Sequence, residues 1–501
     1  MDANEALRLV NRCYARLNGR RGEMRVREEY YEGKQPLNFA TAEWKKANSA
    51  RYANFADNWC QPVADAEAER IAHTGIKIAG TNGKAAAQKL WEAWLRNEMQ
   101  SQSSQGFLTS LVTSRSFVTV WGDENDEPLI SWEHPDSVEI EYDWERPGRR
   151  TAALKTWVDE SKEYATLYES ECVWKFERAL PKTTNDRESQ ATQAKVGVAH
   201  EGGWVPRIPR GDDVWPIWNP MGTVPVVEVP NRPMLGGDPR SEISGVIAMQ
   251  DTINLLWAYL LLAADYASMD ARVVLGQGPP MMPILDKNGV KIGEKPVDIG
   301  EMREKRMLYL TNPDAKIDSW NAAALDTFTE TIEIAVGHIA AQTRTPPTYL
   351  VTRTGMSNVN GEGLKASEIG LVKKVIEFTT FATPAMREVH RLVALAMGDT
   401  ALAEQVRLAT MTWMNPEIRS EAQLADSLTK KKAIGYPLRY LMELDGLDPL
   451  EIDRVMEMHD DEQRDVQLEE ARKGLRDIVD PYRDEQLLLN AADDSGGNSE
   501  E

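Results

Sequence analysis

The chain has 501 residues, of which 42% are hydrophobic, and its formal net charge is -21 at pH 7. This length and apolar content allow several domains with buried cores and exclude disorder of the whole chain. The acidic balance disfavours an ordinary nucleic-acid binder, because such proteins gain affinity from Lys and Arg side chains that neutralise phosphates. The three cysteines have no CxxC spacing, so they suggest neither a disulfide framework nor a zinc site and fit a reducing compartment.

The hydrophobic period of the first half changes near residue 110. Up to that point the pattern is mostly helical, beginning with an amphipathic first helix rather than a signal peptide. From about 110 to 230, alternating apolar and polar residues predict antiparallel strands. Residues 181–215 are rich in Thr, Gln, Arg and Gly and predict a long mobile insertion.

An acidic run lies within the predicted strands. Its carboxylates occupy alternate positions, Glu139, Glu141, Asp143 and Glu145. Strict alternation predicts the solvent face of a strand rather than a metal site.

Two long helices bracket a small β-rich excursion in the second half. The first begins at an N-cap, Ser241, and lasts to about Ala271. Its apolar part, 253–264, is too short for a membrane span and predicts a helix buried against partners. Short strand-like pieces follow, and the second long helix runs from about Asp326 to the "RTPP" run.

A polar loop, "TRTGMSNVNG", then leads into a third helix from about Leu364 to Met397. Pro384 is expected to kink this helix. A strand within "VRLATMTWMNP", further helices over 417–480 and a disordered acidic end complete the chain.

Catalytic and ligand-binding signatures are weak. The run "GTNGKA" lacks the glycine spacing and the Ser or Thr of a phosphate-binding loop, and the six histidines are scattered singly. We therefore expect no catalytic residues, metal or cofactor. A helix as apolar as 253–264 needs neighbours, and a ring follows if these come from further copies of the chain.

Six stretches in order along the chain resemble the portal proteins of tailed double-stranded DNA bacteriophages, in the branch of long-tailed phages of actinobacteria. They are "EEYYEGKQPL", "NWCQPVADAEAERIAHTGIKI", "VPVVEVPN" with "GDPRSEI", "RTPPTYL", "GEGLKASE" and "WMNPEIRSEAQLADSLTKKKAIGYP". The resemblance implies an α+β, mainly helical portal fold that assembles as a ring of about twelve subunits. It also implies a division into regions called wing, stem, clip and crown. These are the wing at 1–238, stem helix 1 at 239–272, the clip at 273–322, stem helix 2 at 323–345, the tunnel loop at 346–363, a kinked helix and wing strand at 364–416, the crown at 417–490 and an acidic tail at 491–501.

The same resemblance implies a conduit without sequence specificity for double-stranded DNA at one capsid vertex. The expected partners are the terminase large subunit of the ATP-driven packaging motor, then the head-to-tail adaptor, and the major capsid and scaffold proteins, with no membrane. The protein would be assembled in the host bacterial cytoplasm and reside in the virion. An acidic wall suits this role, because it repels the duplex instead of holding it.

The tunnel loop supplies the candidate site residues. Those expected to touch the DNA backbone are Thr352, Arg353, Met356, Ser357, Asn358 and Asn360. Those expected to act as hinges are Gly355, Gly361, Gly363 and Pro384. For Arg353, a salt bridge between subunits is as good an interpretation as a phosphate contact.

Two other functions are compatible with the sequence. One is an oligomeric virion or scaffold-type protein that never meets DNA. The other is an enzyme whose site is built from isolated residues such as His134 and Asp136.

Overall fold

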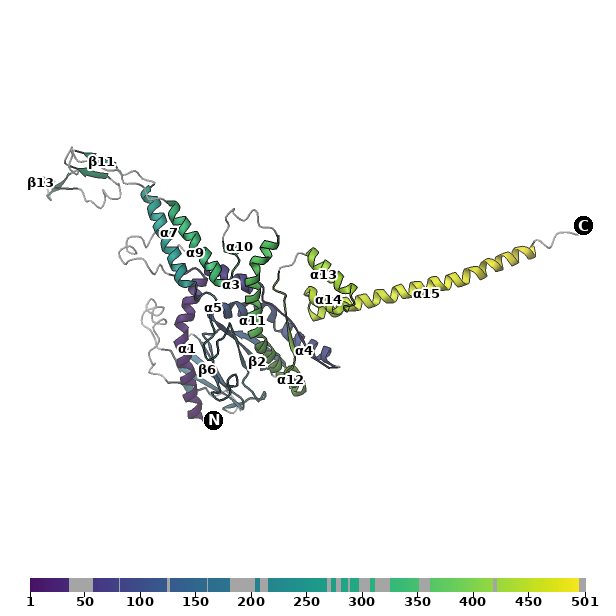
Figure 1. Cartoon of the computed structure of the whole chain (residues 1–501). Coiled ribbons are helices and arrows are strands. Elements are labelled where there is room, and N and C mark those ends of the chain that lie inside the picture. Colours follow the sequence, from purple (N-terminus) through teal and green to yellow (C-terminus); the bar gives the residue numbers. More distant parts are fainter. Residues whose placement is uncertain are drawn as a thin grey trace, which may run out of the picture.

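A computed structural model provides the fold. It describes residues 1–35, 57–80, 82–123, 127–159, 161–180, 203–207, 215–267, 272–275, 281–286, 289–296, 307–310, 325–350, 361–417 and 421–494. These residues form the predicted α+β fold, which is mostly helical (Figure 1).

The N-terminal part is helical, as predicted. It contains α1 (Ala3–Tyr31), α3 (Cys60–Ala68), α4 (Gly83–Arg96) and α5 (Met99–Thr113). A capping box starts α1: the Asp2 carboxylate accepts from the backbone N–H of Glu5, and the Glu5 carboxylate accepts from that of Asp2. Val10, Cys13 and Leu17 lie on the buried face of this helix.

Two antiparallel sheets follow, also as predicted. The first has the order β10-β2-β3, with β2 (Arg115–Gly122), β3 (Pro128–Glu133) and β10 (Val226–Pro230). The second joins β4 (Val138–Tyr142), β5 (Arg150–Val158), β6 (Lys162–Glu169), β7 (Cys172–Ala179) and β8 (Val205–Pro206), while β9 (Ile217–Trp218) also pairs with β7. The register places Leu154, Leu167 and Trp174 side by side, and α1 packs on this layer.

Part of the predicted mobile insertion belongs to the second sheet. Val205 pairs with Glu177 of β7, and the buried Trp204 packs edge-on against Tyr14 of α1. The expectation of a mobile insertion is therefore wrong for 203–207. Residues 181–202 and 208–214 lie outside the described residues.

The prediction that the acidic strand faces solvent is wrong for its first two carboxylates. Glu139 and Glu141 are only 5% and 7% exposed, because α1 covers this face of β4. Arginines four residues apart on α1 supply the countercharge: Arg16 and Arg20 lie 2.9 and 2.5 Å from Glu139, and Arg12 lies 2.9 Å from Glu141. The alternation thus marks an ionic contact between a helix and a strand.

Helices α7 (Ile247–Ala267) and α9 (Leu325–Thr343) pack side by side and carry strands at their far end (Figure 1). There β11 (Arg272–Leu275) runs parallel to β14 (Met307–Leu310), and β12 (Met281–Leu285) pairs antiparallel with β13 (Lys291–Pro296). The predicted strand-like character of this excursion is confirmed for these four strands.

By length and composition, α7 is apolar enough to cross a membrane. The polar side chains of α7 show that the face carrying Gln250 and Asn254 packs against protein. Gln250 accepts from the Trp59 N–H at 2.7 Å, Asn254 accepts from the Asp57 N–H at 3.0 Å, and both amide side chains are buried.

The predicted N-cap of α7, Ser241, lies five residues too early, because the helix begins at Ile247 instead of 242. The Ser241 hydroxyl accepts from the Ile243 N–H at 3.2 Å, but residues 242–246 form turns before the helix begins at Ile247. The next residue, Glu242, forms ion pairs with Arg232 and with Lys374 of α11 in this turn region.

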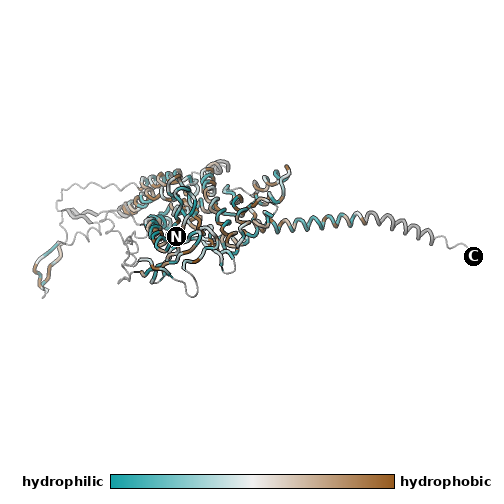
Figure 2. The backbone as a smooth tube through the Cα atoms, turned by 90° about the horizontal axis from the view of Figure 1, so that it is seen from below, coloured by the Kyte–Doolittle hydropathy of each residue, from teal (hydrophilic) through white to brown (hydrophobic). Residues whose placement is uncertain are grey.

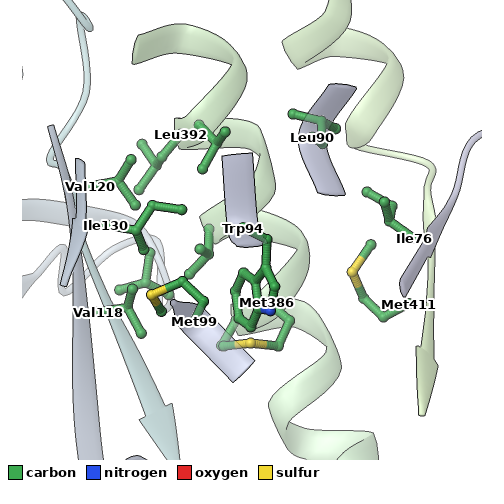
Figure 3. Packing of buried hydrophobic residues seen from close by; sticks show 14 of the residues in the cluster. Ile76, Leu90, Trp94, Met99, Val118, Val120, Ile130, Met386, Leu392 and Met411 are labelled. Carbon is green, nitrogen blue, oxygen red and sulfur yellow. The ribbon is translucent and has the colours of Figure 1, made fainter. Parts of the chain in front are cut away.

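The main core forms around α11 (Gly361–Ala396), which continues through Pro384. Met386 and Leu392 of α11 meet Trp94, Met99 and strand residues such as Val118 in this core (Figure 3). Next come α12 (Thr400–Val406) and the predicted strand β15 (Thr410–Trp413), which pairs with β1 (His73–Lys77).

Helices α13 (Glu421–Ala433), α14 (Leu438–Asp445) and α15 (Pro449–Asp494) end the described chain. Lys77 of β1 binds Glu443 of α14, and Lys84 of α4 lies 2.6 Å from Asp453 of α15. Beyond these contacts α15 extends away from the body (Figures 1 and 2). The prediction that the acidic tail is disordered over 491–501 is wrong for 491–494, which belong to α15; residues 495–501 lie outside the described residues.

Candidate functional site

Most of the predicted DNA-contacting segment lies outside the described residues. This applies to Thr352, Arg353, Gly355, Met356, Ser357, Asn358 and Asn360. Gly361 and Gly363 belong to the first turn of α11, and Pro384 lies inside that helix. The structure describes how the chain on both sides of 351–360 is fixed.

Before the segment, the chain leaves α9 through a tight C-cap. Arg344 adopts the left-handed conformation with φ 55°, and the Thr345 N–H donates to the Ala340 carbonyl at 3.1 Å, as in a Schellman motif. A residue other than glycine costs about 1 kcal/mol or more in this conformation, so surrounding contacts must hold it. Gly370 of α11 lies against this cap, where an added Cβ would come within 3.3 Å of the Arg344 Cβ.

The buried guanidinium of Arg70, just after α3, contacts residues on both sides of the segment. It donates to the Tyr349 hydroxyl of α10 (Pro347–Leu350) at 2.7 Å and lies 3.4 Å from the Glu368 carboxylate of α11. It also donates to the Pro416 carbonyl at 3.1 Å. Burial alone would lower the pKa of Arg70, but its bonds to Tyr349 and Glu368 outweigh burial and raise the pKa. One permanent charge therefore joins the two ends of the segment.

A second set of buried charges ties α11 to the start of α7. Lys374 of α11 lies 2.9 Å from Glu67 of α3 and 2.6 Å from Glu242, and Arg232 also binds Glu242. The side chains of Lys374, Glu67 and Glu242 are at most 1% exposed. We call Glu67, Arg232, Glu242 and Lys374 the buried charge cluster. Burial raises the pKa of Glu67 to about 7, although the ammonium of Lys374 acts in the opposite direction.

Sequence reasoning missed Arg70 and the buried charge cluster. One signal was available for Lys374, because Leu371, Val375 and Phe378 place it on the apolar side of a helix. Glu67 similarly follows Val63 and Ala64 at helical spacing. A charge on such a stripe indicates a buried partner, but the sequence does not identify the partner.

The residues of the enzyme alternative form an ionic contact. His134 lies between two carboxylates, with its Nδ1 2.8 Å from Asp136 and its Nε2 2.5 Å from Glu28 of α1. Burial alone would lower the pKa of His134, but the hydrogen bonds to Asp136 and Glu28 outweigh burial and raise the pKa to about 9. A histidine held protonated at neutral pH is poorly suited to act as a general base.

Two histidines that are far apart in the sequence meet in the main core. The Nε2 atoms of His73 and His390 are 3.0 Å apart, so the expectation that the histidines stand singly is wrong for this pair. Burial lowers the pKa of His73 to about 4 and also lowers that of His390. Among the described residues, no group of three His, Cys, Asp or Glu side chains could hold a metal ion.

Comparison with known proteins identifies the family of this chain. A family model described as "Phage portal protein, SPP1 Gp6-like" matches residues 10–465. The chain belongs to this family. Portal proteins are structural components of the phage virion, so the alternative of an enzyme built on His134 and Asp136 is rejected.

Curated relatives agree with the family. The chain is 26% identical over 382 residues to the portal protein of Mycobacterium phage D29 and 25% identical over 381 residues to that of Mycobacterium phage L5. Each match covers 73% of this chain and 70% of the relative. Among solved structures, the chain is similar to one titled "Neck of native GTA particle computed with C12 symmetry", at 12% identity and a TM-score of 0.36, covering 81% of this chain and 93% of the other.

The stretches that carry the resemblance to portal proteins meet at the buried charges. Arg70 and Glu67 lie in "NWCQPVADAEAERIAHTGIKI", Tyr349 in "RTPPTYL" and Glu368 in "GEGLKASE". Glu242 lies in "GDPRSEI", and Pro416 is the fourth residue of "WMNPEIRSEAQLADSLTKKKAIGYP". In this portal protein these stretches form the frame around 351–360.

Replacing Lys374 with Met is expected to destabilise the fold by about 3–5 kcal/mol, because two carboxylates would stay buried without their shared cation. Glu67→Gln is the matched control. Since burial raises the pKa of Glu67, its ionised form is already disfavoured in the fold, and loss of its charge should cost much less. Urea unfolding of both variants measures the difference, and equal losses would contradict the assigned roles.

The raised pKa of His134 predicts that the stability of the fold decreases at alkaline pH. Its folded-state pKa is about 9 and its unfolded value about 6.5, so its contribution to stability is complete below about pH 6.5 and is lost as the pH rises through 9. Urea midpoints between pH 6 and 10 should therefore fall more steeply for the unmodified chain than for His134→Gln. An imidazole titration midpoint near 6.5 by NMR would show that the carboxylates do not hold the proton.

Proposed function

We propose that copies of this chain form the ring-shaped channel at one capsid vertex through which double-stranded DNA is packaged, retained and ejected. The observation that carries the proposal is the frame around 351–360, in which Arg70 contacts Tyr349 before the segment and Glu368 after it. A ten-residue segment fixed at both ends can present its side chains to a passing duplex while its base stays in place.

We assign the regions of the subunit as the family resemblance implies. The stem is 239–272 with 323–345, the clip is 273–322, and the wing is 1–238 with 364–416. The crown is 417–490 and the tunnel loop is 346–363. The pairing of α7 with α9, and the strands at their far end, support a stem that carries a clip (Figure 1).

Charge supports a loose contact with DNA. The segment 351–360 has no acidic residue and one basic residue, Arg353, in a chain of net charge -21. Each phosphate that is neutralised adds affinity, and tight binding would slow a moving duplex. A single arginine per subunit keeps this affinity low. Thr352, Ser357, Asn358 and Asn360 add hydrogen-bonding groups that read no sequence, and Gly355 supplies backbone freedom within the segment. Gly361 and Gly363 lie in the first turn of α11 instead.

The proposed partners follow the regions. We infer a ring of about twelve copies in which the clip docks the terminase large subunit and later the head-to-tail adaptor, with the major capsid and scaffold proteins as further partners of the ring. Exposed apolar side chains on the hairpin of β12 and β13 support a docking role there, because such patches on soluble proteins mark interaction surfaces. They are Met281, Met282, Ile284, Leu285 and Ile292.

Electron microscopy of the purified chain, alone and after assembly with its capsid proteins, tests the ring. We expect rings of about twelve subunits with an axial hole of roughly 20 Å or more, wide enough for a duplex. A chain that stays monomeric under both conditions would refute the proposal. Rings without a continuous axial hole would favour a virion protein that never meets DNA.

Shortening 355–361 is expected to leave ring assembly intact but to reduce DNA packaging or retention, because the frame that holds both ends does not depend on the loop itself. A Gly and Ser linker of the original length is the matched control, which separates loop length from loop side chains. Nuclease-protected DNA per assembled particle is the measurement. Unchanged DNA content in the shortened variant would contradict a role of the loop in DNA packaging and retention.

A further inference from the structure

We propose that the groove between α13 and α14 of one subunit receives the exposed apolar side of α15 from a neighbouring copy. This inference rests on the ring proposed above. It assigns one specific contact between subunits, and it gives a role to the long helix that leaves the body of the subunit.

The groove has a volume of about 240 Å³ and a mainly apolar lining. Its lining residues are Leu428, Thr429, Lys432, Leu438, Leu441, Met442 and Asp445. Further apolar side chains in the same region stand in solvent, namely Ile434 at 74% exposure and the stacked Tyr436 and Tyr440. An apolar groove with an exposed apolar border is typical of an interaction surface.

Helix α15 offers a complementary surface. Leu468 and Leu475 are 57% and 61% exposed and lie seven residues apart, with the exposed Ala471 between them, so the three share one side of the helix. A 46-residue helix with such a stripe gains stability chiefly by packing that side against a partner.

Charges select the pairing. The last turn of α13 carries Lys430, Lys431 and Lys432. In α15, residues 457–475, which include this stripe, contain seven acidic side chains and three basic ones, Arg464, Arg472 and Lys473, so the region is acidic on balance. Opposite charges around an apolar contact favour this pairing and disfavour contact between two acidic α15 helices.

The α15 helix that fills the groove has to come from another copy of the chain. The α15 helix leaves its own subunit near Asp453, which is paired with Arg439 of α14 and Lys84 of α4 at 2.6 Å each. Leu468 lies 15 residues further on, or about 22 Å along a straight helix, and α15 points away from the body (Figure 1). A groove and a helix on different surfaces form a heterologous contact, which closes into a ring when the rotation permits.

Charge exchange tests the contact in the full chain. The pair Lys431→Glu with Lys432→Glu is expected to weaken subunit association about tenfold, as is Glu469→Lys with Glu470→Lys, because each places like charges together. Combining the four substitutions should restore association. Arg407→Glu, an exposed reversal outside the groove, is the matched control and should change association little.

Native mass spectrometry gives the subunit count, and a disulfide between Lys432→Cys and Leu468→Cys in mixed rings reports the contact directly. Intact rings in all charge variants would overturn this inference and leave the proposed function standing. A disulfide that forms only between two Leu468→Cys side chains, and not between Leu468→Cys and Lys432→Cys, would do the same. Failure of the unmodified chain to form rings would instead count against the proposed function. Loss of DNA retention with unchanged subunit association would show that the lysines face DNA, and would also overturn the contact.

Discussion

Two charged side chains near the end of α3, Glu67 and Arg70, join parts of the fold that are far apart in the sequence. Each is buried and each has a partner on α11, Lys374 for Glu67 and Glu368 for Arg70. Removing ions from water costs several kcal/mol per ion, and only close pairing offsets that cost. A helix packed one turn out of place would separate both pairs, so these contacts fix the position of α11 along α3. The start of α7 and the chain on both sides of 351–360 take their positions from this arrangement.

The same type of contact joins the remaining layers. Arginines of α1 bind Glu139 and Glu141 of β4, and Arg150 of β5 binds Glu388 of α11. Apolar clusters supply most of the driving force within each layer, because burial of apolar surface is non-directional and scales with area. Ion pairs make the relative placement of the layers specific, since they require particular side chains to meet. The result is a framework in which layers made of distant segments meet in one way.

Local patterns predicted the elements well and their partners poorly. In α9, Phe328, Ile332, Ala335, Val336 and Ile339 recur at helical spacing, and all of them except the half-buried Phe328 are buried. The interpretation of the acidic strand failed for Glu139 and Glu141 because their arginine partners lie 119–129 positions earlier, and the His73–His390 contact spans 317 positions. Ser241 resembled a helix start because a hydroxyl that caps a turn looks the same in sequence as one that caps a helix. For the segment 351–360, the DNA-contacting residues stay predictions.

The internal use of arginine bears on how such a subunit meets DNA. The chain has 58 basic and 79 acidic residues, and many described arginines already bind carboxylates within the subunit, among them Arg16, Arg70, Arg115 and Arg178. A cation engaged in this way attracts phosphate weakly, because the neighbouring carboxylate cancels its field. Stiffening the subunit with ion pairs therefore also removes the sites to which a polyanion would adhere. We propose that the segment 351–360, whose only charged residue is Arg353, makes contact with the duplex in the channel, where its hydroxyl and amide groups could exchange hydrogen bonds with water as the DNA moves.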